Sequence, residues 1–190
     1  MSRFNALVIG TSAGGLNALT RILPALDSDF PAPIIIVQHM SPDGSNFTAS
    51  LLDRISKLTI KEGDEKEKLE PGTVYLAAPN YHLLIERDKT LSLSVDPKVN
   101  YSRPSIDVLF ESAAEAYSDK LLGLILTGAN NDGTMGAIKI IKFGGSVIVE
   151  DPDSAEASAM PLSVIENCKV DKILPLDEIA DYLNIIIKEN

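Results

Sequence analysis

Short apolar runs alternate with amphipathic segments along most of this chain. Residues 4–9 predict a buried strand, and Ile34-Ile35-Ile36-Val37 is a continuous β-branched run, typical of a strand that is covered on both faces of a parallel sheet. Residues 14–26 predict a helix with one apolar face. The same patterns predict strands at 73–77, 121–127, 146–149 and 172–174, and helices at 45–55, 105–117, 135–143, from 161, and at 176–187.

Two stretches depart from this alternation. Residues 81–86 and 90–95, separated by Arg87-Asp88-Lys89, predict a β-hairpin, whereas residues 57–68 are charged and aperiodic and predict a solvated segment. Strands that alternate with helices favour right-handed βαβ units. We therefore predict one α/β domain over residues 1–190: a doubly wound, mostly parallel sheet with helices on both faces and an antiparallel hairpin at one edge.

The first predicted strand ends in a glycine-rich turn. Gly10-Thr11-Ser12-Ala13-Gly14 matches G-x-S-x-G, the pattern of a nucleophile elbow, in which glycines permit a sharp bend and leave the serine hydroxyl exposed. The helix that follows also aims free N–H groups at an anion beside that hydroxyl. The same turn also fits two other interpretations, a cradle for a nucleotide phosphate and a serine that only caps the helix.

Nucleotide binding needs residues that this turn lacks. A P-loop requires a lysine that does not follow Gly15. A dinucleotide site requires G-x-G-x-x-G and an acidic residue at the end of the second strand, which here ends in Gln38-His39. The pattern therefore favours hydrolysis, and a nucleotide-binding α/β domain stays as an alternative.

Ser12, His39 and Asp132 each follow a predicted strand. Because the carboxyl ends of parallel strands lie along one edge of a sheet, these three residues can converge there. A hydroxyl nucleophile needs a base, and an imidazole base needs a carboxylate that orients it. Each residue also has a purely structural interpretation: a helix cap for Ser12, a backbone-bonded histidine for His39, and a plain turn or helix cap for Asp132 in Asn-Asp-Gly.

Other reactive residues are few. His82, on the predicted hairpin, competes with His39 for the role of base. The two histidines are far apart in sequence and lack metal-ligand spacing, so we predict no metal and no cofactor. Cys168 is the single cysteine and has no histidine close to it in sequence, which predicts a packed or half-exposed thiol.

The net charge excludes some classes of partner, and the apolar runs and the cysteine count indicate the compartment. Its 27 acidic and 17 basic residues give a net charge of −10, which argues against nucleic acids and anionic membrane surfaces as partners. No apolar run is long enough to span a bilayer, and a single cysteine cannot form an internal disulfide. We therefore expect a cytoplasmic protein without direct membrane insertion.

Several runs, in this order, resemble the catalytic domain of the CheB family of chemotaxis protein-glutamate methylesterases over nearly the whole chain. They are Val8–Gly15, Gln38-His39-Met40, Leu69–Ala77, Arg103–Phe110, Leu126-Thr127-Gly128 with Asn131-Asp132-Gly133, and Leu174–Ile179. The resemblance implies a Ser-His-Asp hydrolase, with Ser12 as nucleophile, His39 as base and Asp132 as the orienting carboxylate. It needs no cofactor.

The resemblance also implies a substrate and an oxyanion site. Members of the family hydrolyse γ-glutamyl methyl esters in the helical cytoplasmic region of methyl-accepting chemotaxis receptors, and some deamidate glutamine there. The backbone N–H of Ala13, with one from the loop at 128–131 that includes Ala129 and Asn130, is expected to stabilise the tetrahedral oxyanion.

Departures from the family pattern include one in a loop and one at the start of the chain. Ala129 and Asn130 replace the methionine and the second glycine of the usual Gly-Met-Gly-x-Asp-Gly loop, which motivates an alternative: a catalytically degenerate binding module of a chemosensory array. The resemblance also begins almost at Met1, so we expect a catalytic domain without the receiver domain and linker that family members usually carry in front of it.

Overall fold

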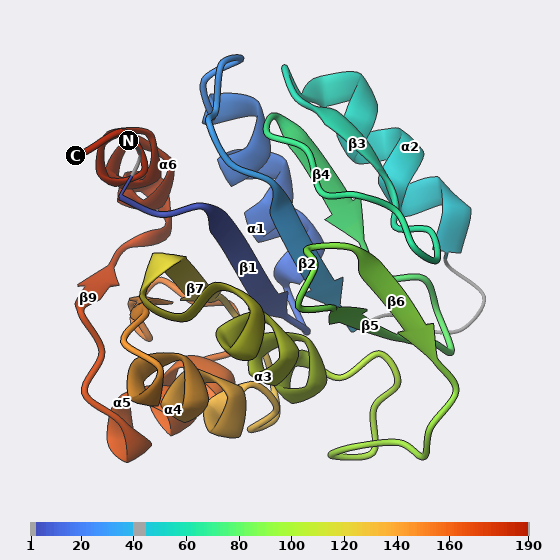
Figure 1. The fold of residues 1–190 in the computed structure, drawn as a ribbon. Helices are drawn as coiled ribbons and strands as arrows, with labels where there is room; N and C mark the ends of the chain where they lie inside the picture. Colours follow the sequence, from blue (N-terminus) through green and yellow to red (C-terminus); the bar gives the residue numbers. More distant parts are fainter. Residues whose placement is uncertain (1–2, 40–44, 190) are drawn as a thin grey trace.

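Seven parallel strands form the sheet at the centre of the molecule (Figure 1). The computed structural model describes residues 3–39 and 45–189. In spatial order the strands are β3 (Thr59–Glu62), β4 (Thr73–Leu76), β2 (Ile34–Gln38), β1 (Ala6–Thr11), β7 (Leu121–Ile125), β8 (Ser146–Glu150) and β9 (Lys172–Leu174). This confirms the predicted doubly wound α/β fold.

Helices cover both faces of this sheet. β1 and β2 are buried at every position, because their side chains point alternately into two apolar cores. Leu7 and Ile9 of β1 point into the first core, which also holds side chains of α1 (Gly15–Ile22), α2 (Ser45–Ile55) and α6 (Leu176–Ile186). Ala6 and Val8 point into the second core, with α3 (Ile106–Tyr117), α4 (Thr134–Lys142) and α5 (Ala159–Asn167).

The predicted hairpin is present as β5 (His82–Ile85) and β6 (Leu91–Ser94), which pair antiparallel in a two-stranded sheet of their own. Its apolar side chains, Leu83, Ile85 and Leu91, are buried in the second core beside α3. The hairpin therefore covers part of one face of the main sheet, whose two edge strands are β3 and β9.

The prediction that residues 57–68 form a solvated segment was wrong for β3. Ile60 is 5% exposed in the first core, and Thr59 and Lys61 on either side are exposed or half-buried. A short edge strand needs only one apolar face, and charged residues protect its open edge from pairing with other chains. One buried residue among charges gives too weak an alternation to recognise in the sequence.

Two helix ends also differ from the prediction. α1 ends at Ile22 and continues as a 3₁₀ turn over Leu23–Ala25, which contains Pro24. α5 begins at Ala159, so that Pro161 lies in its first turn, where a missing N–H costs no helical hydrogen bond. None of the helices that the structure describes is long and apolar enough to cross a membrane.

Candidate active site

The turn that carries Ser12 is held through its backbone. The N–H of Ser12 donates to the carbonyl of Thr127 (3.0 Å), and the carbonyl of Ser12 accepts from the N–H of Gly15 (2.9 Å). Gly14 has φ 78°, a left-handed conformation that a side chain would strain. Ser12 is half-buried, and its hydroxyl makes no hydrogen bond with any described residue. The turn therefore fixes the position of Ser12, and its oxygen is not engaged by the part of the chain that the structure describes.

His39 lies beside Ser12 because of the strand register. Thr11 pairs with Gln38 across β1 and β2, and the N–H of His39 donates to the carbonyl of Thr11 (3.0 Å). Ser12 and His39 are the next residues on two strands that are roughly 5 Å apart. The sheet thus brings together two residues that are far apart in sequence.

The side chain of Gln38 ties these two residues together. Its Nε2 donates to the carbonyl of Ser12 (2.9 Å) and to that of His39 (2.8 Å), and the residue is only 6% exposed. A Cβ at Gly15 would lie 2.0 Å from Gln38 Oε1, so only glycine leaves room for this amide. The sequence analysis missed this role of Gln38, whose only signal was its place next to His39.

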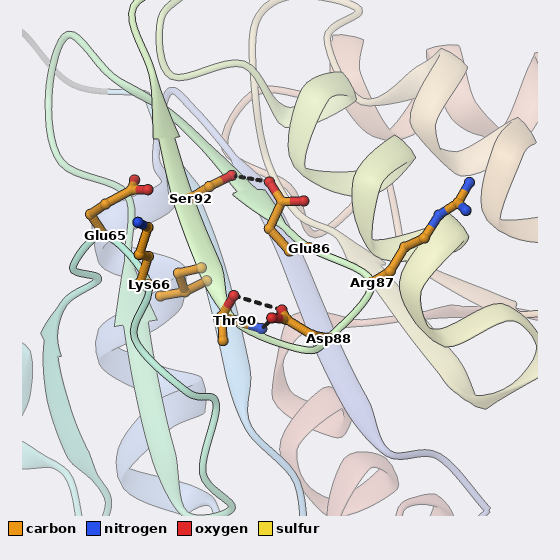
Figure 2. Close-up of a pocket in the computed structure, with 8 residues that line it drawn as sticks. Glu65, Lys66, Glu86, Arg87, Asp88, Thr90 and Ser92 are labelled. Carbon is orange, nitrogen blue, oxygen red and sulfur yellow. Dashed lines mark hydrogen bonds between the residues drawn. The ribbon is translucent and has the colours of Figure 1, made fainter.

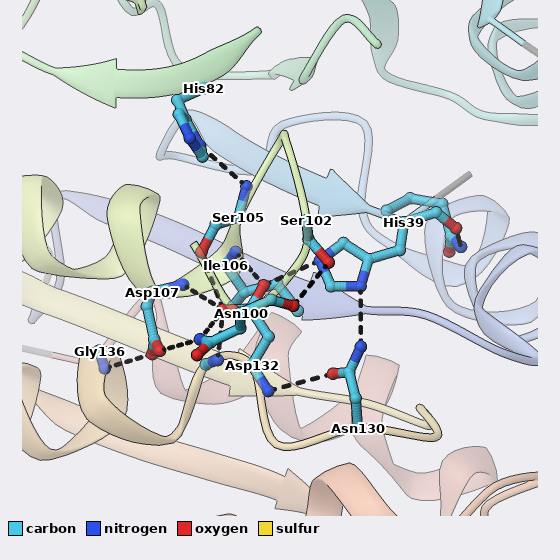
Figure 3. A network of polar contacts seen from close by, with 12 residues as sticks. His39, His82, Asn100, Ser102, Ser105, Ile106, Asp107, Asn130, Asp132 and Gly136 are labelled. Carbon is cyan, nitrogen blue, oxygen red and sulfur yellow. Dashed lines mark hydrogen bonds and ion pairs between the residues drawn. The ribbon is translucent and has the colours of Figure 1, made fainter. Parts of the chain in front are cut away.

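Asp132 is the most heavily hydrogen-bonded side chain in this region, as Figure 3 shows. Its carboxylate is fully buried, and six groups donate to it: the side chains of His39, Asn100 and Ser105 and the backbone N–H groups of Ile106, Asp107 and Gly133. Burial raises the pKa of Asp132, but the bonds from His39, Asn100, Ile106 and Asp107 outweigh it and hold the pKa below its ordinary value. The group is therefore a stable carboxylate at neutral pH.

Asp132 also caps α3 from another loop. Ser105 is the N-cap residue of this helix, yet its hydroxyl donates to Asp132 Oδ1 (2.8 Å) instead of capping its own helix. The first two helical N–H groups, of Ile106 and Asp107, donate to Asp132 at 2.7 and 3.1 Å. A helix N-terminus stabilises a negative charge, so the fold of α3 itself holds this carboxylate in place.

The ring of His39 is held on both sides (Figure 3). Its Nε2 lies 2.8 Å from Asp132 Oδ2, and its Nδ1 lies 3.4 Å from Asn130 Nδ2; the side chain is 12% exposed. Because Nε2 faces a carboxylate, it carries the proton of the neutral ring, and Nδ1 is the nitrogen that can accept one. No hydrogen bond between the described residues joins this ring to the Ser12 hydroxyl.

A second buried carboxyl group, which the sequence analysis missed, lies next to Asp132. Asn100 Nδ2 donates to Asp107 Oδ2 (2.7 Å) and to Asp132 Oδ1 (2.9 Å), and Asp107 Oδ1 accepts from the N–H of Gly136 (2.7 Å). Burial and the nearby negative charge of Asp132 raise the pKa of Asp107 to about 6. Its position within the run Arg103–Phe110 was the only sequence signal, and it gave no role.

His82 and Cys168, the other reactive residues that the sequence offered, are engaged with the backbone. His82 is 1% exposed; its Nε2 donates to the carbonyl of Pro97 (3.1 Å) and its Nδ1 accepts from the N–H of Ser105 (3.2 Å). Both ring nitrogens are thus engaged with backbone, and His82 has none left to act as a base. Cys168 is half-buried, as expected, and its thiol donates to the carbonyl of Val164.

The three residues assigned to the oxyanion site lie in the loops that follow β1 and β7. Ala13 and Ala129 are exposed and Asn130 is half-buried. Within residues 3–39 and 45–189, no group accepts a hydrogen bond from the backbone N–H of Ala13 or of Asn130. The side chain of Asn130 is engaged at both ends, because its Oδ1 accepts from the N–H of Asp132 (3.1 Å) while its Nδ2 faces His39.

Two hollows mark the surface around the site and the hairpin. One, of about 140 Å³, adjoins His39 and is lined by Asn80, Lys98, Tyr101, Ser102, Arg103 and Pro104. Tyr101 is 97% exposed there, whereas Arg103 donates to the carbonyls of Val95 and Asp96. The other, of about 500 Å³, lies along the hairpin (Figure 2) and contains none of the predicted site residues. Of these two hollows, the one beside His39 is the one that adjoins a predicted site residue.

Comparisons with known proteins agree on one family. A family model described as CheB methylesterase matches residues 7–183. A putative protein-glutamate methylesterase/protein-glutamine glutaminase of Leptospira interrogans is 52% identical over 178 residues, which cover 94% of this chain and 92% of that protein. The protein-glutamate methylesterase/protein-glutamine glutaminase of Thermotoga maritima is 41% identical over 180 residues, and the chain spans about half (52%) of its length.

A solved structure gives the same result for the fold. The crystal structure of the Thermotoga maritima CheB methylesterase catalytic domain matches with a TM-score of 0.91 at 40% identity, covering 95% of this chain and 97% of that one. The agreement extends over nearly all of both chains. The chain belongs to the CheB methylesterase family.

Proposed function

We propose that this chain is a protein-glutamate methylesterase that hydrolyses γ-glutamyl methyl esters in the cytoplasmic helical region of chemoreceptors and releases methanol, as part of chemotaxis signalling. The observation that carries the proposal is the bond between His39 and the buried, ionised Asp132, at the strand end next to Ser12. Membership in the CheB methylesterase family gives this geometry its substrate class. We place the reaction in the cytoplasm.

The proposed chemistry assigns one step to each residue. His39 Nδ1 takes the proton of Ser12 as its oxygen attacks the ester carbonyl, while Asp132 holds the ring and stabilises the imidazolium. The backbone N–H of Ala13 and one from the loop at 128–131 donate to the developing oxyanion. Methanol leaves with the proton from His39, and a water molecule activated by the same nitrogen hydrolyses the acyl-enzyme.

The same site suits glutamine deamidation. A side-chain amide differs from the methyl ester only in its leaving group, so that ammonia replaces methanol in forming the same acyl-enzyme. The relatives in Leptospira interrogans and Thermotoga maritima carry both activities in their names. We therefore propose deamidation as a second reaction of this site, which a receptor with glutamine at the modified position would reveal.

Release of methanol from methyl-labelled receptor tests the proposal. Ser12→Ala removes the nucleophile and is expected to lower the rate by about 10⁴- to 10⁶-fold. Ser50→Ala, at an exposed position on α2, is the matched control and should keep the wild-type rate. Equal methanol release from Ser12→Ala and wild type would refute the proposal.

The two alternatives have weaker support. The comparisons favour the enzyme over a degenerate binding module, and His39 and Asp132 remain in contact despite the changes at Ala129 and Asn130. Labelling of Ser12 by a fluorophosphonate would exclude the degenerate module. The nucleotide-binding domain finds no support among the matching families, and calorimetry with nucleotides should show no heat of binding.

A further inference from the structure

We infer that Asn130 is a positioning residue that occupies the proton-accepting nitrogen of His39 until substrate arrives. The inference rests on the proposed function, because it concerns the step in which His39 takes the proton of Ser12. Its starting point is the 3.4 Å separation between Asn130 Nδ2 and His39 Nδ1.

The orientation of the Asn130 amide follows from its second contact. Its Oδ1 accepts a hydrogen bond from the N–H of Asp132 (3.1 Å), a local turn that asparagine side chains commonly form. With the oxygen engaged there, the NH₂ group is the end that faces the ring (Figure 3). An amide NH₂ can only donate, and it meets the one ring nitrogen that can accept.

Asn130 and Ser12 therefore compete for one lone pair. Asp132 holds Nε2 at 2.8 Å, so the ring cannot offer that nitrogen to the serine. The Ser12 hydroxyl has no hydrogen bond with the described residues, and Nδ1, the nitrogen to which it would donate, already faces the Asn130 amide. At 3.4 Å the hydrogen bond from the Asn130 amide to His39 Nδ1 is long and weak. It therefore restrains the base but can break when His39 takes the proton of Ser12.

Chemical modification of His39 tests this inference without any ester substrate. Diethyl pyrocarbonate acylates an unprotonated, accessible imidazole nitrogen, and mass spectrometry locates the modified residue. We expect Asn130→Ala to raise the rate at His39 by about two- to tenfold, the effect of removing one neutral hydrogen bond. Asn131→Ala is the matched control, because Asn131 is exposed and its backbone carbonyl, which the substitution keeps, accepts from the N–H of Thr134.

One further variant and an internal reference separate the restraint from a loss of structure. Asn130→Ser keeps an oxygen that can accept the N–H of Asp132 but lacks the NH₂ group, so it should behave like Asn130→Ala at the ring. Asn130 is not among the residues with positive φ, so both substitutions suit its backbone. His82, 1% exposed, should stay unmodified in every folded variant. Unchanged modification of His39 in both variants would overturn the inference.

Turnover provides the second measurement. Asn130→Ala should raise kcat and the rate of fluorophosphonate labelling of Ser12 by about two- to tenfold, with KM unchanged. A fall in kcat would overturn the inference that Asn130 restrains His39. It would indicate instead that the Asn130 amide donates to the oxyanion. If the wild type releases no methanol while His39 modification still rises in Asn130→Ala, the proposed function fails and the contact between Asn130 and His39 stands.

Discussion

The two halves of the candidate site are built in different ways. On the side of the base, Asp132 is fully buried and accepts six hydrogen bonds, three of them from backbone N–H groups around the start of α3 and α4. On the side of the nucleophile, Ser12 is anchored only through its own N–H and carbonyl, and its hydroxyl has no bond with the described residues. The carboxylate is thus fully hydrogen-bonded in the folded chain, whereas the serine hydroxyl is positioned but not bonded to the described residues.

This difference follows from what each group must do. A carboxylate that orients an imidazole works best when fixed, and in a buried site every unpaired oxygen would cost free energy. A nucleophilic oxygen must instead change partners during each turnover, so a strong bond in the resting site would slow it. Mutations on the side of the base should therefore affect both stability and rate, and mutations on the side of the nucleophile should affect mainly rate.

Asp132→Asn is the variant with the largest expected effect. An amide in place of the carboxylate turns one acceptor into a donor facing the N–H of Ile106 and the ring of His39, which favours the wrong tautomer. We expect kcat to fall by about 10⁴-fold and the free energy of unfolding to fall by about 2–4 kcal/mol. Steady-state kinetics and urea denaturation measure both quantities.

The matched control is Asp153→Asn, at an exposed position. It should leave kcat unchanged and keep the free energy of unfolding within about 0.5 kcal/mol of wild type. If Asp132→Asn lost activity but kept full stability, the carboxylate would orient His39 without supporting α3. The contrast between the two halves would then disappear.

Asp107→Asn sharpens the comparison by removing the second carboxyl group, whose pKa is shifted in the opposite direction. The pKa of Asp132 is lowered, so its stabilising contribution is present above its unfolded pKa and is lost as the pH falls through its folded pKa. Asp107 has a pKa raised from 3.8 to about 6, so the folded protein binds its proton more tightly than the unfolded chain. Its charge therefore destabilises the fold progressively between about pH 4 and pH 6.

Asp107→Asn should not show this pH-dependent loss of stability, because its amide does not ionise. Relative to wild type, the free energy of unfolding of Asp107→Asn should rise by about 3 kcal/mol between pH 4 and pH 7, the equivalent of roughly two pKa units. Urea denaturation at a series of pH values measures this difference, with Asp153→Asn as the reference. A difference that stays constant with pH would show that Asp107 is an ordinary carboxylate in the folded protein.

The sequence was informative where a pattern recurs along the chain. The continuous apolar runs of β1 and β2 predicted buried parallel strands, and the residues that follow them, Ser12 and His39, are neighbours through the strand register. Asp132 was harder to place, because it lies well beyond the end of β7, and the loop must turn back to reach α3. Its choice depended on the chemistry of the other two residues.

The sequence was uninformative where a polar side chain acts through a contact distant along the chain. Asn100 bridges Asp107 and Asp132 from an exposed loop, and nothing in its neighbouring residues indicates this. The edge strand β3 was missed for a related reason, since only Ile60 marks its buried face. Such contacts are determined by tertiary packing, which overrides local patterns.

Gln38→Met has the smallest expected effect and tests the side of the nucleophile. The methionine fills a similar volume but cannot donate to the carbonyls of Ser12 and His39, which Gln38 holds at 2.9 and 2.8 Å. Losing two backbone tethers should lower kcat and the rate of fluorophosphonate labelling by about five- to tenfold, with KM nearly unchanged. Because Ser12 keeps its bonds to Thr127 and Gly15, the melting temperature should change by only a few degrees. A large loss of stability with unchanged kcat would instead make Gln38 a packing residue, and the turn at Ser12 would then owe its position to the strand register alone.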